Sequence, residues 1–153
     1  MAFLAGTGAR IGEACALRWS YLDLDAGTAQ LGPTVVRGLN GAGLFVQEQG
    51  KTQTAPRTVA LPPWLVARLL ARQVAAMPNE WDAVFLSPLG RLREVSNTTK
   101  DVRDLLDDAG MEWATSHTFR KSVATLLDAA GVSGREVANQ LGHRRPSMTQ
   151  TTT

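Results

Sequence analysis

Three side chains between Ser116 and His143 have the types and the spacing to bind a phosphate group. His117 and Arg120 are three residues apart, so on a helix their side chains would project from neighbouring points of one face. An arginine that can make two parallel hydrogen bonds, beside a histidine that can change its protonation state, suits a pair of phosphate oxygens. His143 follows a predicted helix end, from which a short turn can return it toward the pair. The alternative is a pair of ordinary helices with solvated polar side chains.

A second candidate group is Arg10 with Glu13, near the start of a helix predicted from Gly6 to Arg18 with Thr7 as its cap. Positive charge is unfavourable near a helix N-terminus, so Arg10 needs a compensating partner. Two explanations stay open: an ion pair with Glu13, which contributes little at a surface, or a bound anion. The same helix would bury an apolar stripe formed by Ile11, Ala14, Cys15 and Leu17.

Lys51 is a third candidate, in a loop (residues 49–56) between two predicted strands. Three runs, residues 28–36, 43–49 and 56–62, are rich in β-branched and aromatic residues and are separated by Gly, Asn and Pro. They predict a small three-stranded antiparallel sheet near the N-terminus. A lysine on a hairpin loop has the reach to insert a cation into a groove, although most loop lysines are simply solvated.

The chain after this sheet is predicted to be mainly helical. Pro62 and Pro63 open a helix at the position where a missing N–H costs nothing. Its buried side would consist of Leu65, Leu69, Leu70, Val74 and Met77. A short apolar run at residues 83–87 is either a strand or a buried loop.

Three further helices are predicted from apolar spacing and glycine stops. The first begins at Ser96 or Asn97 and ends at Gly110, and the second ends at Gly131. The third ends at Gly142 and begins with a capping box in which Ser133 and Glu136 bond each other's backbone N–H. The apolar positions are Val102, Leu105, Leu106 and Ala109 in the first helix, and Val123, Leu126, Leu127 and Ala130 in the second. One small sheet among many helices predicts an α+β fold, mostly helical.

Size and composition are those of an ordinary globular domain. The chain has 153 residues, 44% hydrophobic and 20% charged. It has no apolar run of membrane-spanning length and no basic segment ahead of its first apolar stretch, so we expect a cytoplasmic protein. The single cysteine, Cys15, agrees with a reducing compartment. A net charge of +2 with unevenly placed basic residues allows a basic face for nucleic acid, or simply a solvated mixed surface.

The candidate residues fall in four motifs that occur in one order. These are TGARIGE with Arg10 and Glu13, GKTQTAPRTVALP with Lys51, HTFR with His117 and Arg120, and LGH with His143. The set resembles the catalytic domain of the tyrosine recombinase (phage integrase) family. The segments TGARIGEACALRW and LGHRRPSMTQ are similar to those of integrases from actinobacteria and their phages. The resemblance covers nearly the whole chain.

The resemblance implies roles for each of these residues. Arg10 and Arg120 would clamp the scissile phosphate and neutralise its growing charge, with Glu13 in support. His117 would accept or relay the nucleophile's proton, His143 would donate a hydrogen bond to the phosphate, and Lys51 would protonate the leaving 5′-oxygen. The arginines would replace a metal, so no metal and no cofactor is expected. The partner would be double-stranded DNA, contacted by Arg37, Arg57, Lys121, Arg144 and Arg145.

The nucleophilic tyrosine of the family is expected nine or ten residues after His143, where this chain has Thr152 and Thr153. A threonine hydroxyl lies closer to its own backbone and forms an ester that lacks the leaving ability of a phenol, so we expect no cleavage. The sole tyrosine, Tyr21, follows the first helix and is not expected to substitute.

Further expectations follow from the same resemblance. Residues 1–153 would form one catalytic domain that lacks the family's N-terminal DNA-binding domain and its C-terminal nucleophile segment, which puts assembly into a homo-oligomer on DNA in doubt. Two alternatives stay open. One is a non-catalytic regulator that uses residues 116–141 as a helix-turn-helix and reads bases with Arg135, Glu136, Asn139 and Gln140. The other is an integrase remnant without function.

Overall fold

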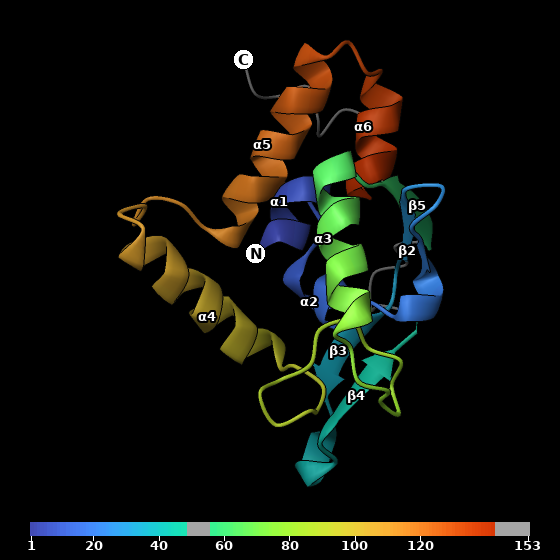
Figure 1. Cartoon of the computed structure of the whole chain (residues 1–153). Coiled ribbons are helices and arrows are strands. Elements are labelled where there is room, and N and C mark those ends of the chain that lie inside the picture. The colour runs from blue at the N-terminus through green and yellow to red at the C-terminus, as the bar shows by residue number, and fades with distance from the viewer. Residues whose placement is uncertain (49–55, 143–153) are drawn as a thin grey trace.

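The computed structural model of the chain describes residues 1–48 and 56–142. Within these residues it has six α-helices: α1 (Ala2–Thr7), α2 (Ile11–Cys15), α3 (Pro63–Val74), α4 (Val95–Asp108), α5 (Ser116–Ala129) and α6 (Gly134–Leu141) (Figure 1). The strands described are β1 (Leu22–Asp23), β2 (Thr28–Leu31), β3 (Thr34–Arg37), β4 (Leu44–Gln47) and β5 (Arg57–Ala60). The predicted α+β class, mostly helical with a small antiparallel sheet, is confirmed.

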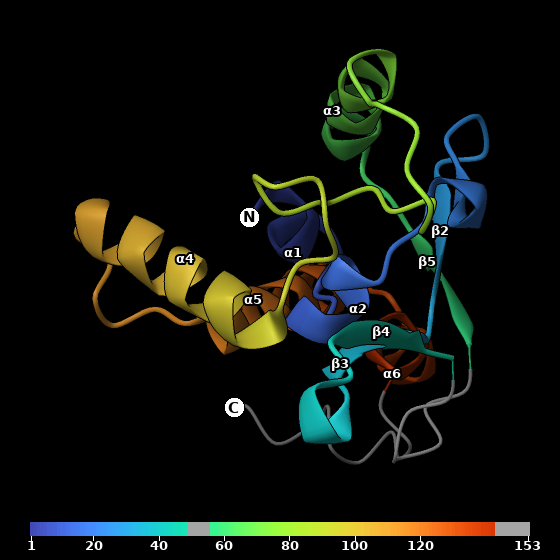
Figure 2. The same ribbon diagram turned by 90° about the horizontal axis from the view of Figure 1, so that it is seen from below.

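Helices α1 and α2 lie at the centre of the molecule. Figure 2 shows α3 and α4 on separate sides of this pair and the strands on another side. Helix α1 contacts α3 and α5, whereas α2 contacts α4 and β3, and α6 contacts both α5 and β5. Side chains at the α1–α2 junction are therefore close to elements that contact α1 or α2, which include α3, α4, α5 and β3.

The strands pair in a different way from the prediction. The run at residues 28–36 is broken at Gly32 and Pro33 into β2 and β3, because proline fixes its φ angle and has no N–H for a ladder. Strand β2 pairs with β1 and β5 in a three-stranded antiparallel sheet, while β3 and β4 form a separate antiparallel pair. At Gly32 a Cβ atom would lie 3.1 Å from Cα of Pro56, so the break is also a close approach of two backbones.

The single helix predicted from Gly6 to Arg18 is wrong, because the chain breaks at Gly8. Gly8 takes a left-handed conformation (φ 67°) and its N–H bonds the Leu4 carbonyl oxygen at 2.9 Å, which ends α1. Thr7 is not a cap for the following helix. Its buried hydroxyl donates to the Phe3 carbonyl oxygen at 2.6 Å and accepts the Ala9 N–H at 3.1 Å. The predicted apolar stripe of Ile11, Ala14, Cys15 and Leu17 is buried, as expected.

Helix α3 begins at its prolines, as predicted, but buries only one narrow stripe. Leu65 and Leu69 are buried, whereas Val74 is 91% exposed and Met77 and Leu70 are also exposed. The prediction was wrong for these last three positions because α3 contacts α1 along one side and ends at Val74, before Met77.

The predicted ends of the last three helices are confirmed. Gly110, Gly131 and Gly142 all have positive φ angles just past α4, α5 and α6, and Ser133 with Glu136 forms the capping box of α6. Leu105 and Leu126, predicted as apolar contacts, are exposed. The run at residues 83–87 is a buried loop at Ala83 and Val84, tied to Arg18 by an isolated β-bridge. No helix in the described part of the chain is both long enough and apolar enough to span a bilayer.

Candidate phosphate-binding site

Arg10 lies at the junction between α1 and α2 and is the N-cap residue of α2. Its backbone N–H donates to Glu13 Oε2 at 2.9 Å, and its Nη1 lies 3.5 Å from Glu13 Oε1. The Arg10 side chain is 49% exposed. The ion pair that the sequence suggested is therefore present, and about half of the Arg10 side-chain surface remains exposed.

Arg120, on α5, is buried and reaches both the α1–α2 junction and the end of α6. Its Nη1 donates to the Gly8 carbonyl oxygen at 2.8 Å, and its Nη2 donates to the Leu141 carbonyl oxygen. Leu141 is the last residue of α6, where carbonyl groups lack partners within the helix, so the guanidinium also caps α6. These bonds use two of its five N–H groups.

Burial and the positive charge of Arg10 lower the pKa of Arg120 to about 10, with Arg57 acting in the same direction and Glu13 opposing. Arg120 thus remains protonated at neutral pH. Since Arg10 and Glu13 act on Arg120 through their charges, Arg120 of the first candidate group lies near the second group. Arg10 and Arg120 are 110 residues apart in the chain, and Arg120 reaches the α1–α2 junction through its bond to the Gly8 carbonyl oxygen.

Glu13 and Arg57 form a buried ion pair beneath Arg10. Arg57 Nη1 lies 2.6 Å from Glu13 Oε1 and Nη2 lies 3.1 Å from Oε2, and both side chains are at most 5% exposed. Burial alone would raise the pKa of the Glu13 carboxyl, but hydrogen bonds and charge from Arg57, with those of Arg10, hold the pKa below its usual value. Arg57 was predicted to contact DNA. That prediction is wrong, because its guanidinium faces the interior.

We call Arg10, Arg57 and Arg120, with the Glu13 carboxylate among them, the arginine cluster. Three guanidiniums and one carboxylate leave two positive charges in excess. Two of these guanidiniums are buried, and like charges in a region of reduced dielectric repel each other strongly. The arrangement is one that a bound anion would relieve, at the side where Arg10 is exposed.

Gln140, on α6, is a structural link that sequence reasoning missed. Its Oε1 accepts the Ala60 N–H at 3.1 Å, and its Nε2 donates to the carbonyl oxygens of Ala60 and Thr7 at 3.3 Å and 3.5 Å. The side chain thus joins α6 to β5 and α1, whereas the regulator alternative placed it on a DNA-reading surface. Arg135, Glu136 and Asn139, the other base-reading candidates, are exposed.

The other predicted site residues differ in how far the structure describes them. His117 is exposed in the first turn of α5, one turn before the buried Arg120. Lys121 is exposed, and Arg37 forms an ion pair with Glu94 in which its Nη2 lies 2.7 Å from Oε2. Six predicted positions lie outside the described residues: Lys51, His143, Arg144, Arg145, Thr152 and Thr153. Tyr21 accepts a hydrogen bond from Arg18 Nη1 at 3.1 Å.

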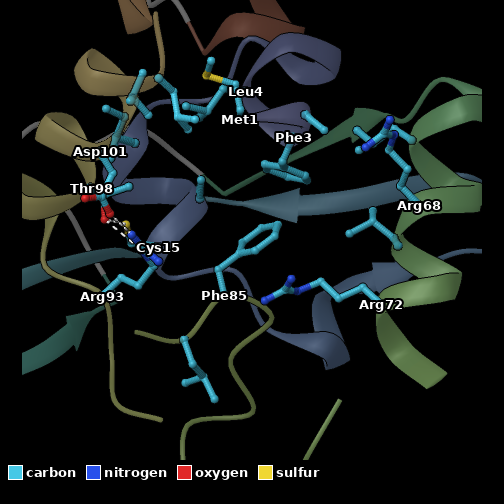
Figure 3. Close-up of a pocket in the computed structure, with 18 of the residues that line it drawn as sticks. Met1, Phe3, Leu4, Cys15, Arg68, Arg72, Phe85, Arg93, Thr98 and Asp101 are labelled. Carbon is cyan, nitrogen blue, oxygen red and sulfur yellow. Dashed lines mark hydrogen bonds and ion pairs between the residues drawn. The ribbon is translucent and has the colours of Figure 1, made fainter. Parts of the chain in front are cut away.

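A cavity of about 890 Å³ lies on another side of α1, between α3 and α4. Figure 3 shows Phe3 and Phe85 within it, Arg68 and Arg72 on the α3 side, and Asp101 on the α4 side. Arg72 donates to the Val84 carbonyl oxygen at 2.8 Å and stacks over the Phe85 ring. None of the arginine cluster lines this cavity, so the two features are separate.

Comparison with known proteins gives one consistent result. A model of the phage integrase family matches residues 1–152. The chain is 32% identical to the tyrosine recombinase XerA of Thermococcus kodakarensis, over 96% of this chain and 46% of that protein. It is 27% identical to a XerC-like tyrosine recombinase of Caldanaerobacter subterraneus subsp. tengcongensis, over 94% of this chain and 41% of that protein. The chain therefore spans less than half the length of these two relatives.

Solved structures agree with the sequence matches. A XerA recombinase crystal structure has a TM-score of 0.79 and 25% identity to the chain, with 97% of this chain and 49% of that one covered. The Tn1549 transposon integrase in complex with transposon right end DNA has a TM-score of 0.77 and 22% identity, with 95% and 50% covered. The second likeness concerns the fold alone.

Proposed function

The chain belongs to the phage integrase family, and from this premise we propose that it is the phosphate-binding part of a site-specific DNA recombinase. The observation that carries the proposal is the excess positive charge of the arginine cluster, in which Arg10 and Arg120 come from distant segments. Double-stranded DNA is the partner. Its phosphodiester is the anion that the exposed side of the cluster would bind.

The roles follow from the chemistry of each group. Arg10 donates from its exposed guanidinium to a phosphate oxygen, and Arg120 adds N–H groups and fixed positive charge from below. Charge that grows on the phosphate during attack is stabilised by donors that are already in position. His117 handles the proton of the nucleophile, while His143 and Lys51 act on the phosphate and the leaving oxygen. Glu13 holds Arg10.

We also propose that residues 1–153 bind DNA without cutting it. The family's tyrosine is expected at Thr152 or Thr153, and a threonine cannot form the phenolic ester. A nicked duplex that traps covalent protein–DNA adducts tests this directly. We expect no adduct that survives denaturation, and a stable adduct would contradict the proposal. Assembly into a homo-oligomer on DNA is a separate proposal, testable by sedimentation with and without duplex.

The clamp itself is tested by measuring the affinity for duplex DNA over a range of salt concentrations. Arg10→Ala should weaken binding about tenfold, as expected for a charge-assisted hydrogen bond, and reduce the slope of log K against log salt by about one. Arg68→Ala is the matched control, since it removes an exposed arginine on α3, away from the cluster. Equal behaviour of the two variants would contradict the clamp. A preference for one short palindrome that is insensitive to Arg10→Ala would instead favour the helix-turn-helix alternative.

A further inference from the structure

We propose that Arg57 is a positioning residue of the DNA-phosphate site. It fixes Arg10 and the end of α6 relative to each other and does not contact DNA itself. The inference rests on the function proposed above and assigns a residue that the catalytic motifs do not include. Its basis is a chain of hydrogen bonds that runs from α6 through Arg57 and Glu13 to Arg10.

The first link joins β5 to α2. Both Nη atoms of Arg57 bond the two carboxylate oxygens of Glu13, a fork that fixes the plane of the carboxylate as well as its distance. Glu13 Oε2 in turn accepts the Arg10 N–H at 2.9 Å. The backbone from which the Arg10 side chain extends is therefore held by a carboxylate that Arg57 orients.

The second link joins β5 to α6. Arg57 Nε donates to the Gln140 carbonyl oxygen at 3.2 Å, in the last turn of the helix. Gly142 then packs directly on the guanidinium, since a Cβ atom at Gly142 would lie 2.8 Å from Cζ and 2.9 Å from Nε and Nη1 of Arg57. The end of α6, which immediately precedes His143, is thus fixed on the Arg57 guanidinium at two points, the Gln140 carbonyl and Gly142.

The position of Arg57 in the sequence adds a third link. It is the first residue of β5, six residues after Lys51, and is fixed by the pairing of β5 with β2. One buried guanidinium on β5 therefore contacts both α2 and the end of α6. A buried ion pair often contributes little net stability compared with apolar residues of similar volume, so stability alone is a weak reason for it.

The charge-conserving variant Arg57→Lys tests the proposal in the full 153-residue chain. An ammonium can pair with Glu13 but cannot orient both carboxylate oxygens and reach the Gln140 carbonyl together. Hydrogen exchange of the Arg10 amide, measured by NMR, reports the held backbone without any DNA. The Val84 amide, bonded to the Leu17 carbonyl oxygen at 2.9 Å, reports general destabilisation. The affinity for duplex DNA is measured in parallel.

We expect Arg57→Lys to accelerate Arg10 amide exchange about tenfold more than Val84 exchange and to weaken DNA binding about tenfold. Arg103→Lys, at an arginine that also bonds a backbone carbonyl but lies on α4, should change neither. Parallel acceleration at both amides, or unchanged DNA affinity in a folded Arg57→Lys, overturns the proposal. Failure of the unmodified chain to bind any duplex would overturn the proposed function instead, while the Arg10 amide would still decide the role of Arg57.

Discussion

Glu13 is an acidic side chain buried among arginines, and its charge should decide how firmly the α1–α2 junction is held. Glu13→Gln leaves Arg57 buried without its counter-charge, so we expect the free energy of unfolding to fall by about 3 kcal/mol at neutral pH. The pKa of the carboxyl is lowered in the folded chain. Its stabilising contribution is therefore complete above the unfolded-state value of about 4.3 and is lost as pH falls through the lower folded-state pKa.

Urea unfolding of both proteins at pH 7, 5, 4 and 3 measures this effect. The difference between Glu13→Gln and the unmodified chain should shrink as pH falls below about 4.3, because the unfolded chain then binds a proton at Glu13 that the folded chain binds only at lower pH. Glu112→Gln, at an exposed carboxylate, provides the control for the loss of an acidic group. A difference that stays constant over this pH range would show that the charge of Glu13 is not what holds the pair.

Individual residues also show which parts of the site a sequence can predict. The ion pair of Arg10 with Glu13 was expected from their spacing of three residues and is present, whereas the proximity of Arg120 was expected only from the family resemblance. The DNA contact predicted for Arg57 assumed an exposed side chain, as arginines in strands usually have, whereas Arg57 is buried. Its alternation with Val59, which is buried on the same face of β5, was a signal for the inward orientation. The missing information was the partner, Glu13, which only the folded chain brings near.

At the scale of elements, the glycine that ends α6 has a second role that Gly110 and Gly131, at the ends of α4 and α5, lack. Gly110 and Gly142 both have a φ angle of 69°, but a Cβ atom at Gly110 meets nothing within 4 Å, whereas at Gly142 it would collide with Arg57. Gly110→Ala should cost about 1 kcal/mol of stability from the left-handed conformation alone. Gly142→Ala should cost about 1–3 kcal/mol more, because Arg57 must move from its partners.

Chemical denaturation of the two variants separates these contributions. Since the backbone strain is the same in both, the difference between them isolates the collision with the guanidinium. In an Arg57→Met background, which itself removes the Glu13 ion pair, Gly142→Ala should cost no more stability than Gly110→Ala does, because the collision with the guanidinium is absent. Equal losses of unfolding free energy in Gly110→Ala and Gly142→Ala would mean that the Arg57 side chain moves aside without destabilising the fold.

The elements themselves were predictable wherever local signals act alone. Helices α3 to α6 were found from apolar spacing, prolines and glycine stops, because these signals act within a few residues. The break at Gly8 and the split at Gly32 and Pro33 were missed. In both places a continuous apolar pattern runs through the break, and tertiary contacts decide where the chain turns. Gly8 provides the carbonyl for Arg120, and Gly32 packs against Pro56.

At the scale of the whole molecule, Arg120 joins two hydrophobic cores. The larger core surrounds α1, α2 and the strands, and a smaller one contains Val123, Val137 and Leu141 between α5 and α6. The bonds from Arg120 to the carbonyl oxygens of Gly8 and Leu141 cross from one to the other. The arginine cluster thus lies where the two cores meet, so the proposed phosphate site depends on the two cores staying packed together.

Arg120→Met should therefore loosen α6 before the rest of the molecule. The variant keeps much of the apolar stem but leaves two backbone carbonyls without their donors, which costs about 2–4 kcal/mol in total. Hydrogen exchange should then be faster in the last turn of α6 than in α3, whereas Arg103→Met, which removes a 2.6 Å bond to the Ala114 carbonyl oxygen, should leave α6 protected. Uniform acceleration through both helices would mean that the two cores unfold as one unit. Another residue would then have to hold the two cores together. Gln140, which bonds Ala60 and Thr7 from α6, would be the residue to replace next.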